Sequence, residues 1–445
     1  MAQPAPAVVE ALLDTLRQKL GPARVLTAPE DIARYRGFPW LPPHPRLPLR
    51  FPLGQPAAVV RPRDSADIAE VLRQATVTGV PVVPYGGGTS VMGGAIPVAG
   101  GIVLDLGAMN RILSIEPANR LARVEPGVIL ADLARAAETH GLLFAHDPWS
   151  QPIATVGGSV GANGVGYLAA GYGAMGDQVR GMEVVLPTGA IVSWPGAAKA
   201  SAGPDLWRLF IGAEGTLGVI TQIVVQLYPV PEARTLAAFR FPTFADGFRA
   251  IDEFFRAGLR PAMVDYEEED GPPLETPADL HLAFDGPREV VKAATKRATR
   301  ICREHGAVDL GQAAAERFWV TRHASAEWFL RRRATVEAMV RESPRAHGSR
   351  YIDVAVPIAR VLEYCRQVVV LARTHGVKVH SFGIWGRPEL VSFILEGPSA
   401  EEPPGPLERT TDAVLRLARQ EGGSIEYCHG VGIRLAHLLA DELGP

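Results

Sequence analysis

A glycine-rich stretch that directly follows a short apolar run limits what this chain can fold into. Residues 85–94 read Tyr-Gly-Gly-Gly-Thr-Ser-Val-Met-Gly-Gly, and the apolar run is 81–84. Consecutive glycines let the backbone approach a ligand closely, and successive N–H groups in such a turn form a concave anion site. The Thr89 and Ser90 hydroxyls add hydrogen-bond donors. The stretch predicts a pyrophosphate-binding loop, although an isolated glycine triplet is more commonly a flexible surface loop.

Composition limits the class of protein and its partners. The 445 residues carry a formal net charge of −3, with 47% hydrophobic and 21% charged residues. We therefore expect a globular protein of about two or three domains, with no electrostatic argument for nucleic acid. Cys302, Cys365 and Cys428 form no CxxC unit, and the N-terminus has no secretory pattern. A cytoplasmic protein is expected, and peripheral association with a membrane stays open.

Short apolar strands alternate with amphipathic helices along most of the chain, which predicts an α+β fold. The uncharged stretch 148–175 is rich in glycine, and we interpret it as packed loops and short strands that line a ligand. Strands are predicted at 57–60, 80–83, 101–106, 121–125, 218–227, 236–241, 279–284, 351–356, 377–382 and 390–396, with a hairpin around Thr188-Gly189. Helices are predicted at 8–20, 128–140, 244–257, 290–305, 358–375 and 407–420, with one that begins at Asp64 and an Arg-rich helical region around 317–341.

Two further glycine-rich stretches follow the first one. Residues 154–164 read Ala-Thr-Val-Gly-Gly-Ser-Val-Gly-Ala-Asn-Gly, and residues 212–221 form a glycine-framed turn before a predicted strand. Two such loops in one domain are hard to explain as ordinary turns, and they could hold a dinucleotide from both ends of its pyrophosphate. The G-x-G-x-x-G fingerprint and a Walker lysine are absent, which disfavours the common dinucleotide-binding folds.

These stretches, in this order and spacing, give the chain a recognisable family pattern. The matching pieces are 84–90, Asp147-Pro148, 154–158, Tyr172-Gly173, 212–221, 353–357 and 429–432. Together they resemble the FAD-linked oxidases of the vanillyl-alcohol oxidase / glycolate oxidase D-subunit superfamily. Within it the chain looks most like the alkyldihydroxyacetonephosphate synthase-like and D-2-hydroxy acid dehydrogenase-like branch. Relatives continue further beyond the His-Gly-Val-Gly turn, so the sequence is either truncated or leaves its site partly open.

The resemblance implies a two-lobed, PCMH-type FAD-binding domain covered by an α+β cap domain. We expect an N-terminal helix and connection at 1–50, the FAD-binding domain at 51–231, the cap at 232–421 and a segment at 422–445 that returns to the flavin. The flavin ring would lie near 154–163, and no histidine is well placed for covalent attachment, so noncovalent FAD is expected. The implied FAD-binding residues are Pro84, Tyr85, Gly86, Gly87, Gly88, Thr89, Ser90, Asp147, Pro148, Thr155, Gly157, Gly158, Ala162, Asn163, Glu214, Gly215, Gly218, Val219 and Ile220.

Three residues are candidates for the catalytic site. His429 can accept a hydroxyl proton as hydride leaves the substrate carbon, although a lone histidine is often structural. Arg322 could grip a substrate carboxylate, but with the arginines at 331–333 it could equally belong to a solvated basic face. Tyr427 could line the same pocket or pack in the core. Trp385 and His380 are weaker pocket candidates.

We expect no metal site. Metal-dependent relatives carry an HAGDGNxH segment and a later EHG segment, whereas the corresponding residues here are 379–391 and 426–430, which lack two of the histidines and the adjacent glutamate. The sequence therefore predicts an FAD-dependent oxidoreductase that oxidises a 2-hydroxy acid or related alcohol by hydride transfer to flavin N5. Flavin-dependent alkyl transfer, as in the ether-lipid synthase, and a flavoprotein subunit without turnover of its own are the alternatives. An electron acceptor, a partner subunit and a homodimer stay open.

Overall fold

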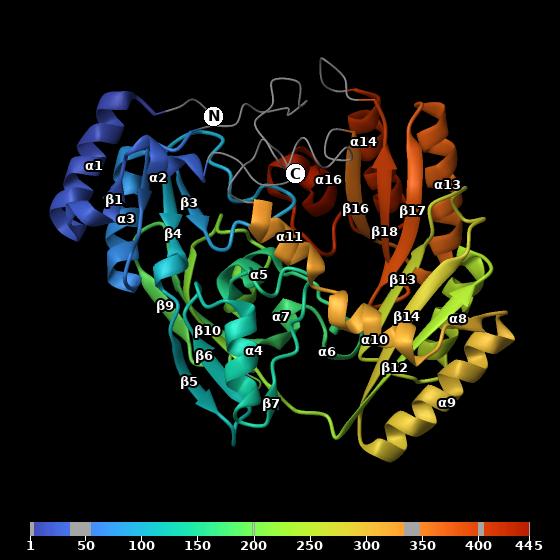
Figure 1. Ribbon diagram of the computed structural model, residues 1–445. Helices are drawn as coiled ribbons and strands as arrows, with labels where there is room; N and C mark the ends of the chain where they lie inside the picture. Colours follow the sequence, from blue (N-terminus) through green and yellow to red (C-terminus); the bar gives the residue numbers. More distant parts are fainter. Residues whose placement is uncertain are drawn as a thin grey trace.

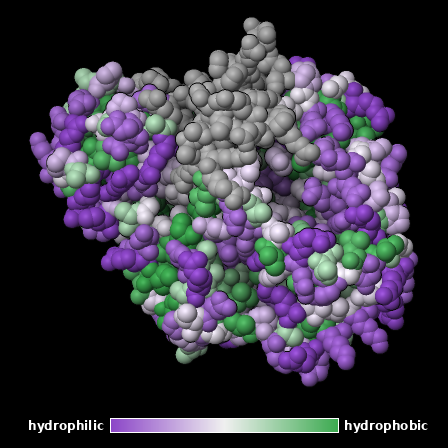
Figure 2. Space-filling view, in the orientation of Figure 1, coloured by the Kyte–Doolittle hydropathy of each residue, from purple (hydrophilic) through white to green (hydrophobic). Residues whose placement is uncertain are grey.

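Two lobes lie side by side in the computed structural model, and each is built on its own β-sheets (Figure 1). The structure describes residues 4–35, 55–197, 199, 201–332, 348–398 and 405–444. The predicted connection at 38–48 and the Arg-rich region beyond residue 332 lie outside the described residues. Hydrophilic residues cover most of the visible face of both lobes, with hydrophobic residues interspersed (Figure 2). No helix within the described ranges is long and apolar enough to cross a membrane.

The first lobe contains a four-stranded sheet, and one of its strands leads directly into the first glycine loop. Its order is β1-β2-β4-β3, and β3 ends at Tyr85, immediately before the glycines. Asp64 caps the following helix as predicted, since its side chain accepts a hydrogen bond of 2.9 Å from the Asp67 N–H. The elements are α1 (Pro6–Leu20), β1 (Val25–Leu26), α2 (Pro29–Ala33), β2 (Ala58–Val60), α3 (Ser65–Thr78), β3 (Val82–Tyr85) and β4 (Ile102–Asp105).

A second, antiparallel sheet completes this lobe with the order β5-β6-β10-β8-β9. The hairpin predicted around Thr188-Gly189 is the β8–β9 connection, and the strand predicted at 218–227 is the central strand β10. The elements are β5 (Ile112–Glu116), β6 (Leu121–Val124), α4 (Leu130–Glu138), β7 (Leu142–Leu143), α5 (Val156–Ala162), α6 (Ala169–Tyr172), α7 (Met175–Gln178), β8 (Val179–Val185), β9 (Ile191–Trp194), β10 (Val219–Gln226) and β11 (Tyr228–Pro229).

The stretch 148–175 contains short helices, so the prediction of short strands there was wrong. Thr155 begins α5 by accepting a hydrogen bond of 3.2 Å from the Gly158 N–H, and Asn163 ends it in the left-handed conformation at φ 50°. Val156 and Val160 are fully buried in the core of the lobe. This tertiary packing outweighs the poor helix propensity of the three glycines in α5.

The second lobe is a seven-stranded antiparallel sheet with the order β15-β12-β14-β13-β17-β18-β16. Helices α8, α9 and α13 cover its outer side, and α10 and α11 lie between the lobes (Figure 1). The sheet strands are β12 (Ala233–Phe241), β13 (Met263–Glu268), β14 (Ala278–Gly286), β15 (Val308–Asp309), β16 (Ser349–Ala355), β17 (Lys378–Trp385) and β18 (Leu390–Glu396). The helices are α8 (Phe244–Arg256), α9 (Arg288–Glu304), α10 (Gln312–Thr321), α11 (Ala324–Arg332), α13 (Val361–Thr374), α14 (Pro406–Gln420), α15 (Gly432–Leu435) and α16 (Leu439–Leu443).

The predicted α+β class is confirmed. The second lobe, called the cap lobe below, lies on the first lobe. Strand β13 was not predicted, because its acids Asp265, Glu267 and Glu268 interrupt the apolar pattern that marks a strand. The predicted domain limits at 50, 231 and 421 stay predictions.

A substitution at Gly157 tests whether close packing against the rest of the first lobe holds α5 in place. A Cβ at this residue would lie 2.5 Å from the Pro126 Cβ, whereas a Cβ at Gly161 in the same helix would meet nothing closer than 3.9 Å. We expect Gly157→Ala to lower the free energy of unfolding by about 1–3 kcal/mol through overpacking. The matched control Gly161→Ala should cause no loss, because alanine is favoured over glycine in a helix. Urea unfolding curves that place both variants at the same stability would contradict this packing.

Candidate active site

The predicted FAD-binding residues come together around one cavity in the first lobe. Asp147 and Asn163 are outside its described lining. The Asn163 Oδ1 accepts a hydrogen bond of 2.9 Å from the Gly176 N–H and so fixes the end of α5. The seventeen others line the cavity: Pro84, Tyr85, Gly86, Gly87, Gly88, Thr89, Ser90, Pro148, Thr155, Gly157, Gly158, Ala162, Glu214, Gly215, Gly218, Val219 and Ile220.

The first and second glycine stretches approach each other so closely that side chains would not fit between them. A Cβ on Gly86 would lie 2.4 Å from the Thr155 Oγ1, and one on Gly87 would lie 2.5 Å from the Ile153 carbonyl oxygen. Residues of both stretches line the cavity, so their backbone can contact a ligand there, as a dinucleotide requires. These residues fit FAD, and the loop at 86–90 would hold its pyrophosphate.

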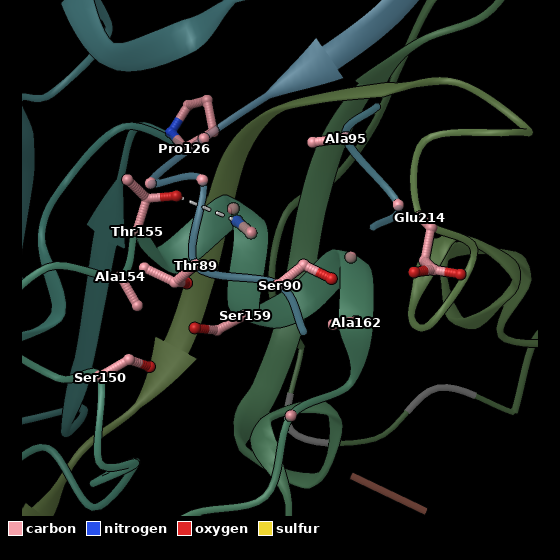
Figure 3. Close-up of a pocket in the computed structure, with 18 of the residues that line it drawn as sticks. Thr89, Ser90, Ala95, Pro126, Ser150, Ala154, Thr155, Ser159, Ala162 and Glu214 are labelled. Atoms are coloured by element: carbon pink, nitrogen blue, oxygen red, sulfur yellow. Dashed lines mark hydrogen bonds between the residues drawn. The ribbon is translucent and has the colours of Figure 1, made fainter. Parts of the chain in front are cut away.

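Hydroxyl groups gather at one end of this cavity. Thr89, Ser150, Thr155 and Ser159 lie on one side of the close-up in Figure 3, and Glu214 lies at the other side. Hydroxyls donate hydrogen bonds to phosphate oxygens, so this end suits the pyrophosphate that the loop at 86–90 would hold. Ser150 and Ser159 were missed from the sequence, where their position inside the uncharged stretch was the only signal.

Glu214 connects the first lobe to the turn that carries His429. Its carboxylate accepts hydrogen bonds of 3.2 and 2.9 Å from the backbone N–H groups of Val431 and Gly432. Burial raises the pKa of Glu214, and these two donors act in the opposite direction. A Cβ at Gly430 would lie 2.7 Å from the Glu214 Oε1, so only glycine allows this contact.

Asp147 binds Arg322, the arginine that was predicted to bind a substrate carboxylate. The Arg322 Nε donates a hydrogen bond of 2.8 Å to the Asp147 Oδ2, and the His323 Nε2 lies 2.7 Å from the Oδ1. Burial would raise the pKa of Asp147, but its partners, His323 foremost, lower it below its usual value. Arg322 also lies over the Trp319 ring, 3.8 Å from its centre. Arg322 is outside the described linings of both cavities around the site.

His429 lies where two cavities meet. It lines the first cavity and a second one in the cap lobe, and Trp149 and Trp385 do the same. The His429 Nδ1 is 3.0 Å from the Asp353 Oδ2, and its Nε2 is 3.6 Å from the Cys428 Sγ. Burial by itself lowers the pKa of His429, but Cys428 and Asp353 outweigh it and hold this pKa well above its usual value.

Glu426 completes a buried group of three titratable side chains. Its Oε1 lies 3.9 Å from the His429 Nδ1, and burial together with Asp353 raises the pKa of Glu426 to about 8. Ligand atoms of Asp353, Glu426 and His429 all lie within 4.8 Å of one another, so these residues are the ones that could hold a metal ion in the described part of the chain. The sequence-based prediction of no metal stays a prediction.

The remaining candidates divide between the cavities and the core. Trp385 lines both cavities, so it is placed at the site, although core packing was the more expected role. Tyr427 is buried against the cluster around Val165 and is outside the described linings. His380 pairs with Asp270 and also lies outside them.

One further histidine of the first cavity was missed from the sequence. His146 is 1% exposed, and burial lowers its pKa to about 4, so it stays neutral. The only sequence signal was its position directly before the matched Asp147-Pro148 pair. Cys428, the neighbour of His429, also lines this cavity.

Comparisons with known proteins agree with this geometry. Residues 56–194 match the family described as FAD binding domain, and residues 230–445 match FAD linked oxidases, C-terminal domain. The glycolate oxidase subunit GlcD of Bacillus subtilis is 32% identical over 402 residues, which cover 87% of this chain and 83% of the relative. A D-lactate dehydrogenase of Anaerostipes hadrus is 30% identical over 418 residues, or 88% and 84% of the two chains.

The fold is shared with a solved structure of alkyldihydroxyacetonephosphate synthase. The match covers 96% of this chain and 81% of the synthase with a TM-score of 0.75 and 18% identity. At this identity the likeness concerns the fold alone. With the family matches and the 32% identical relative, it follows that the chain belongs to the FAD-linked oxidases.

Proposed function

We propose that this protein is an oxidoreductase with noncovalently bound FAD that oxidises the hydroxyl group of a 2-hydroxy acid. The observation that carries the proposal is the position of His429, at the junction of the cavity that fits FAD and the cavity in the cap lobe. A base there would reach a substrate hydroxyl and the cofactor at the same time. The names of the relatives at about 30% identity, glycolate oxidase subunit and D-lactate dehydrogenase, support this substrate class.

His429 would take the hydroxyl proton at its Nε2. The Asp353 carboxylate beside the Nδ1 orients the ring and stabilises its positive charge after the transfer, as in other carboxylate–histidine pairs. When bound, the flavin would accept the hydride from the substrate carbon. Trp149 and Trp385, at the junction of the cavities, would keep water away from the reacting groups.

Two alternatives have weaker support. Alkyl transfer rests on the fold shared with the synthase at 18% identity. A flavoprotein subunit that works within a larger assembly rests on the word subunit in the name of the Bacillus relative. The electron acceptor and a homodimer stay open within the proposal.

Anaerobic mixing tests the function directly. The purified protein should be yellow and should release its FAD on denaturation, and a 2-hydroxy acid such as D-lactate or glycolate should bleach the flavin absorbance. His429→Asn should keep the FAD and slow the bleaching by about 10²–10⁴-fold, because the general base is lost. A colourless protein that does not bind FAD would contradict the proposal, whereas full activity of His429→Asn would contradict only the role of His429 as the base. Persistent failure to bleach would favour the subunit alternative.

The rate of bleaching should rise with pH. His429 acts as a base only when it is deprotonated, and its neighbours hold its pKa well above 6.5. At low substrate concentration the midpoint of the rise should therefore lie above that value. Asp353→Asn removes a negative neighbour, so it should lower the pKa of His429 and move the midpoint to lower pH. An unchanged midpoint in this variant would show that Asp353 does not act on the base.

We also propose that the group around His429 works without a metal ion. The segments at 379–391 and 426–430 lack two of the histidines and the adjacent glutamate that metal-dependent relatives carry. Dialysis against EDTA should therefore leave the bleaching rate unchanged. A loss of activity that added Zn²⁺ or Mn²⁺ restores would instead make Asp353, Glu426 and His429 metal ligands.

A further inference from the structure

His146 lines the cavity that fits FAD and is buried without a hydrogen bond to hold its ring. It is 1% exposed, and its Nδ1 has no hydrogen-bond partner within the described residues. Burial lowers its pKa and the charge of Asp147 raises it, while no hydrogen bond contributes to this pKa. The Phe144 ring packs edge-on against it, with 6.4 Å between the ring centres. A buried polar ring of this kind is costly unless a ligand supplies a partner.

The edge of the ring that contains Cε1 and Nε2 faces Gly164. A Cβ at Gly164 would lie 3.6 Å from the His146 Cε1, 3.7 Å from the His146 Nε2 and 3.9 Å from the carbonyl oxygen of Cys428. These three residues all line the cavity that fits FAD. The His146 Nε2 therefore borders this cavity at the end where the turn that carries His429 lies.

The Nε2 is the ring nitrogen that we expect to carry the proton. Burial lowers the pKa of His146 to about 4, so the ring is neutral near pH 7 and only one nitrogen is protonated. A buried N–H group without an acceptor is rarer in folded proteins than a buried lone pair without a donor. Because the Nδ1 has no partner, the proton belongs on the Nε2. His146 thus offers the cavity an uncharged hydrogen-bond donor in a fixed position.

The position of His146 favours the cofactor over the substrate as the acceptor. His429, Trp149 and Trp385 line both cavities, whereas His146 lines the first and is outside the described lining of the second. The proposed reaction requires the flavin ring of FAD at the junction of the two cavities, which is the end that His146 borders. The flavin ring offers carbonyl oxygens and ring nitrogens as acceptors, and it gains negative charge on reduction. A donor beside it therefore stabilises the reduced form more than the oxidised form.

We propose that the His146 Nε2 donates a hydrogen bond to an acceptor atom of the flavin ring and thereby raises the reduction potential of bound FAD. A neutral imidazole suits this role, because it can stabilise negative charge that develops on the ring without placing an unpaired cation in a buried site beforehand. The inference rests on the proposed function only in that FAD is bound with its ring at the junction of the cavities. It requires no particular substrate.

The reduction potential of the bound flavin, measured against a reference dye, tests the hydrogen bond. His146→Leu removes the donor, so it should shift the equilibrium about tenfold towards oxidised flavin, which lowers the two-electron potential by about 30 mV. His146→Gln, whose amide nitrogen can reach the position of the Nε2, should recover most of this loss. The matched control is His140→Leu, because His140 is an exposed histidine outside the described cavity lining and should leave the potential unchanged.

A measurement on the unaltered protein decides the matter if a variant does not fold. In FAD-loaded protein with ¹⁵N-labelled histidine at pH 5, the His146 ring is neutral, whereas the raised pKa of His429 keeps that ring charged. His281, another histidine whose pKa burial lowers to about 4, is outside the described linings of both cavities. Chemical reduction of the flavin should therefore shift the Nε2–H signal of one neutral ring, that of His146.

The possible outcomes separate this inference from the proposed function. A His146→Leu potential equal to that of the wild type, or neutral-ring signals that flavin reduction leaves unchanged, would overturn the hydrogen bond even if hydroxy acids still reduce the flavin. An unchanged potential together with slower reduction by D-lactate would place His146 at the substrate and would also overturn it. The expected loss of potential without flavin reduction by any hydroxy acid would support the hydrogen bond and overturn the oxidation.

Discussion

The carboxylate of Glu214 joins two parts of the site that lie far apart in the sequence, the third glycine stretch and the turn that carries His429. Glu214 lies in the third glycine stretch and accepts hydrogen bonds from the N–H groups of Val431 and Gly432, 217 and 218 residues further along. Two backbone donors offset the cost of burying this carboxylate, and without it they would be left unpaired. The turn that carries His429 is thereby fixed beside the cavity that fits FAD.

A second contact joins the lobes on another side of the site. Asp147 of the first lobe binds Arg322 and His323, which form the connection between α10 and α11. A buried carboxylate with two basic partners is destabilised strongly when either partner is removed. The contact fixes the position of the α10–α11 connection relative to the first lobe.

Local sequence patterns predicted most of the strands and indicated that the glycine-rich stretches line one cavity, because backbone conformation and close approach depend on adjacent residues such as those at 85–94. Pairings over long distances were not predictable. Arg322 is an unremarkable member of an Arg-rich region until the fold brings it to Asp147, 175 residues away. Strand β13 was missed for a related reason. Two of its acids line the second cavity, which forms only when the chain folds. His429 was singled out through its glycine-framed turn, whereas its contact with Asp353, a residue of the matching piece 353–357, was not predicted.

The most direct test of this account is the rate of anaerobic flavin reduction in a Glu214→Ala variant loaded with FAD. If Glu214 positions the turn, His429 should be displaced and the rate per bound flavin should fall by about 10²-fold or more, as for loss of a general base. Glu214→Gln, which keeps one acceptor oxygen, should recover part of that rate. A Glu214→Ala protein that binds FAD fully and is reduced within twofold of the wild-type rate would contradict the account.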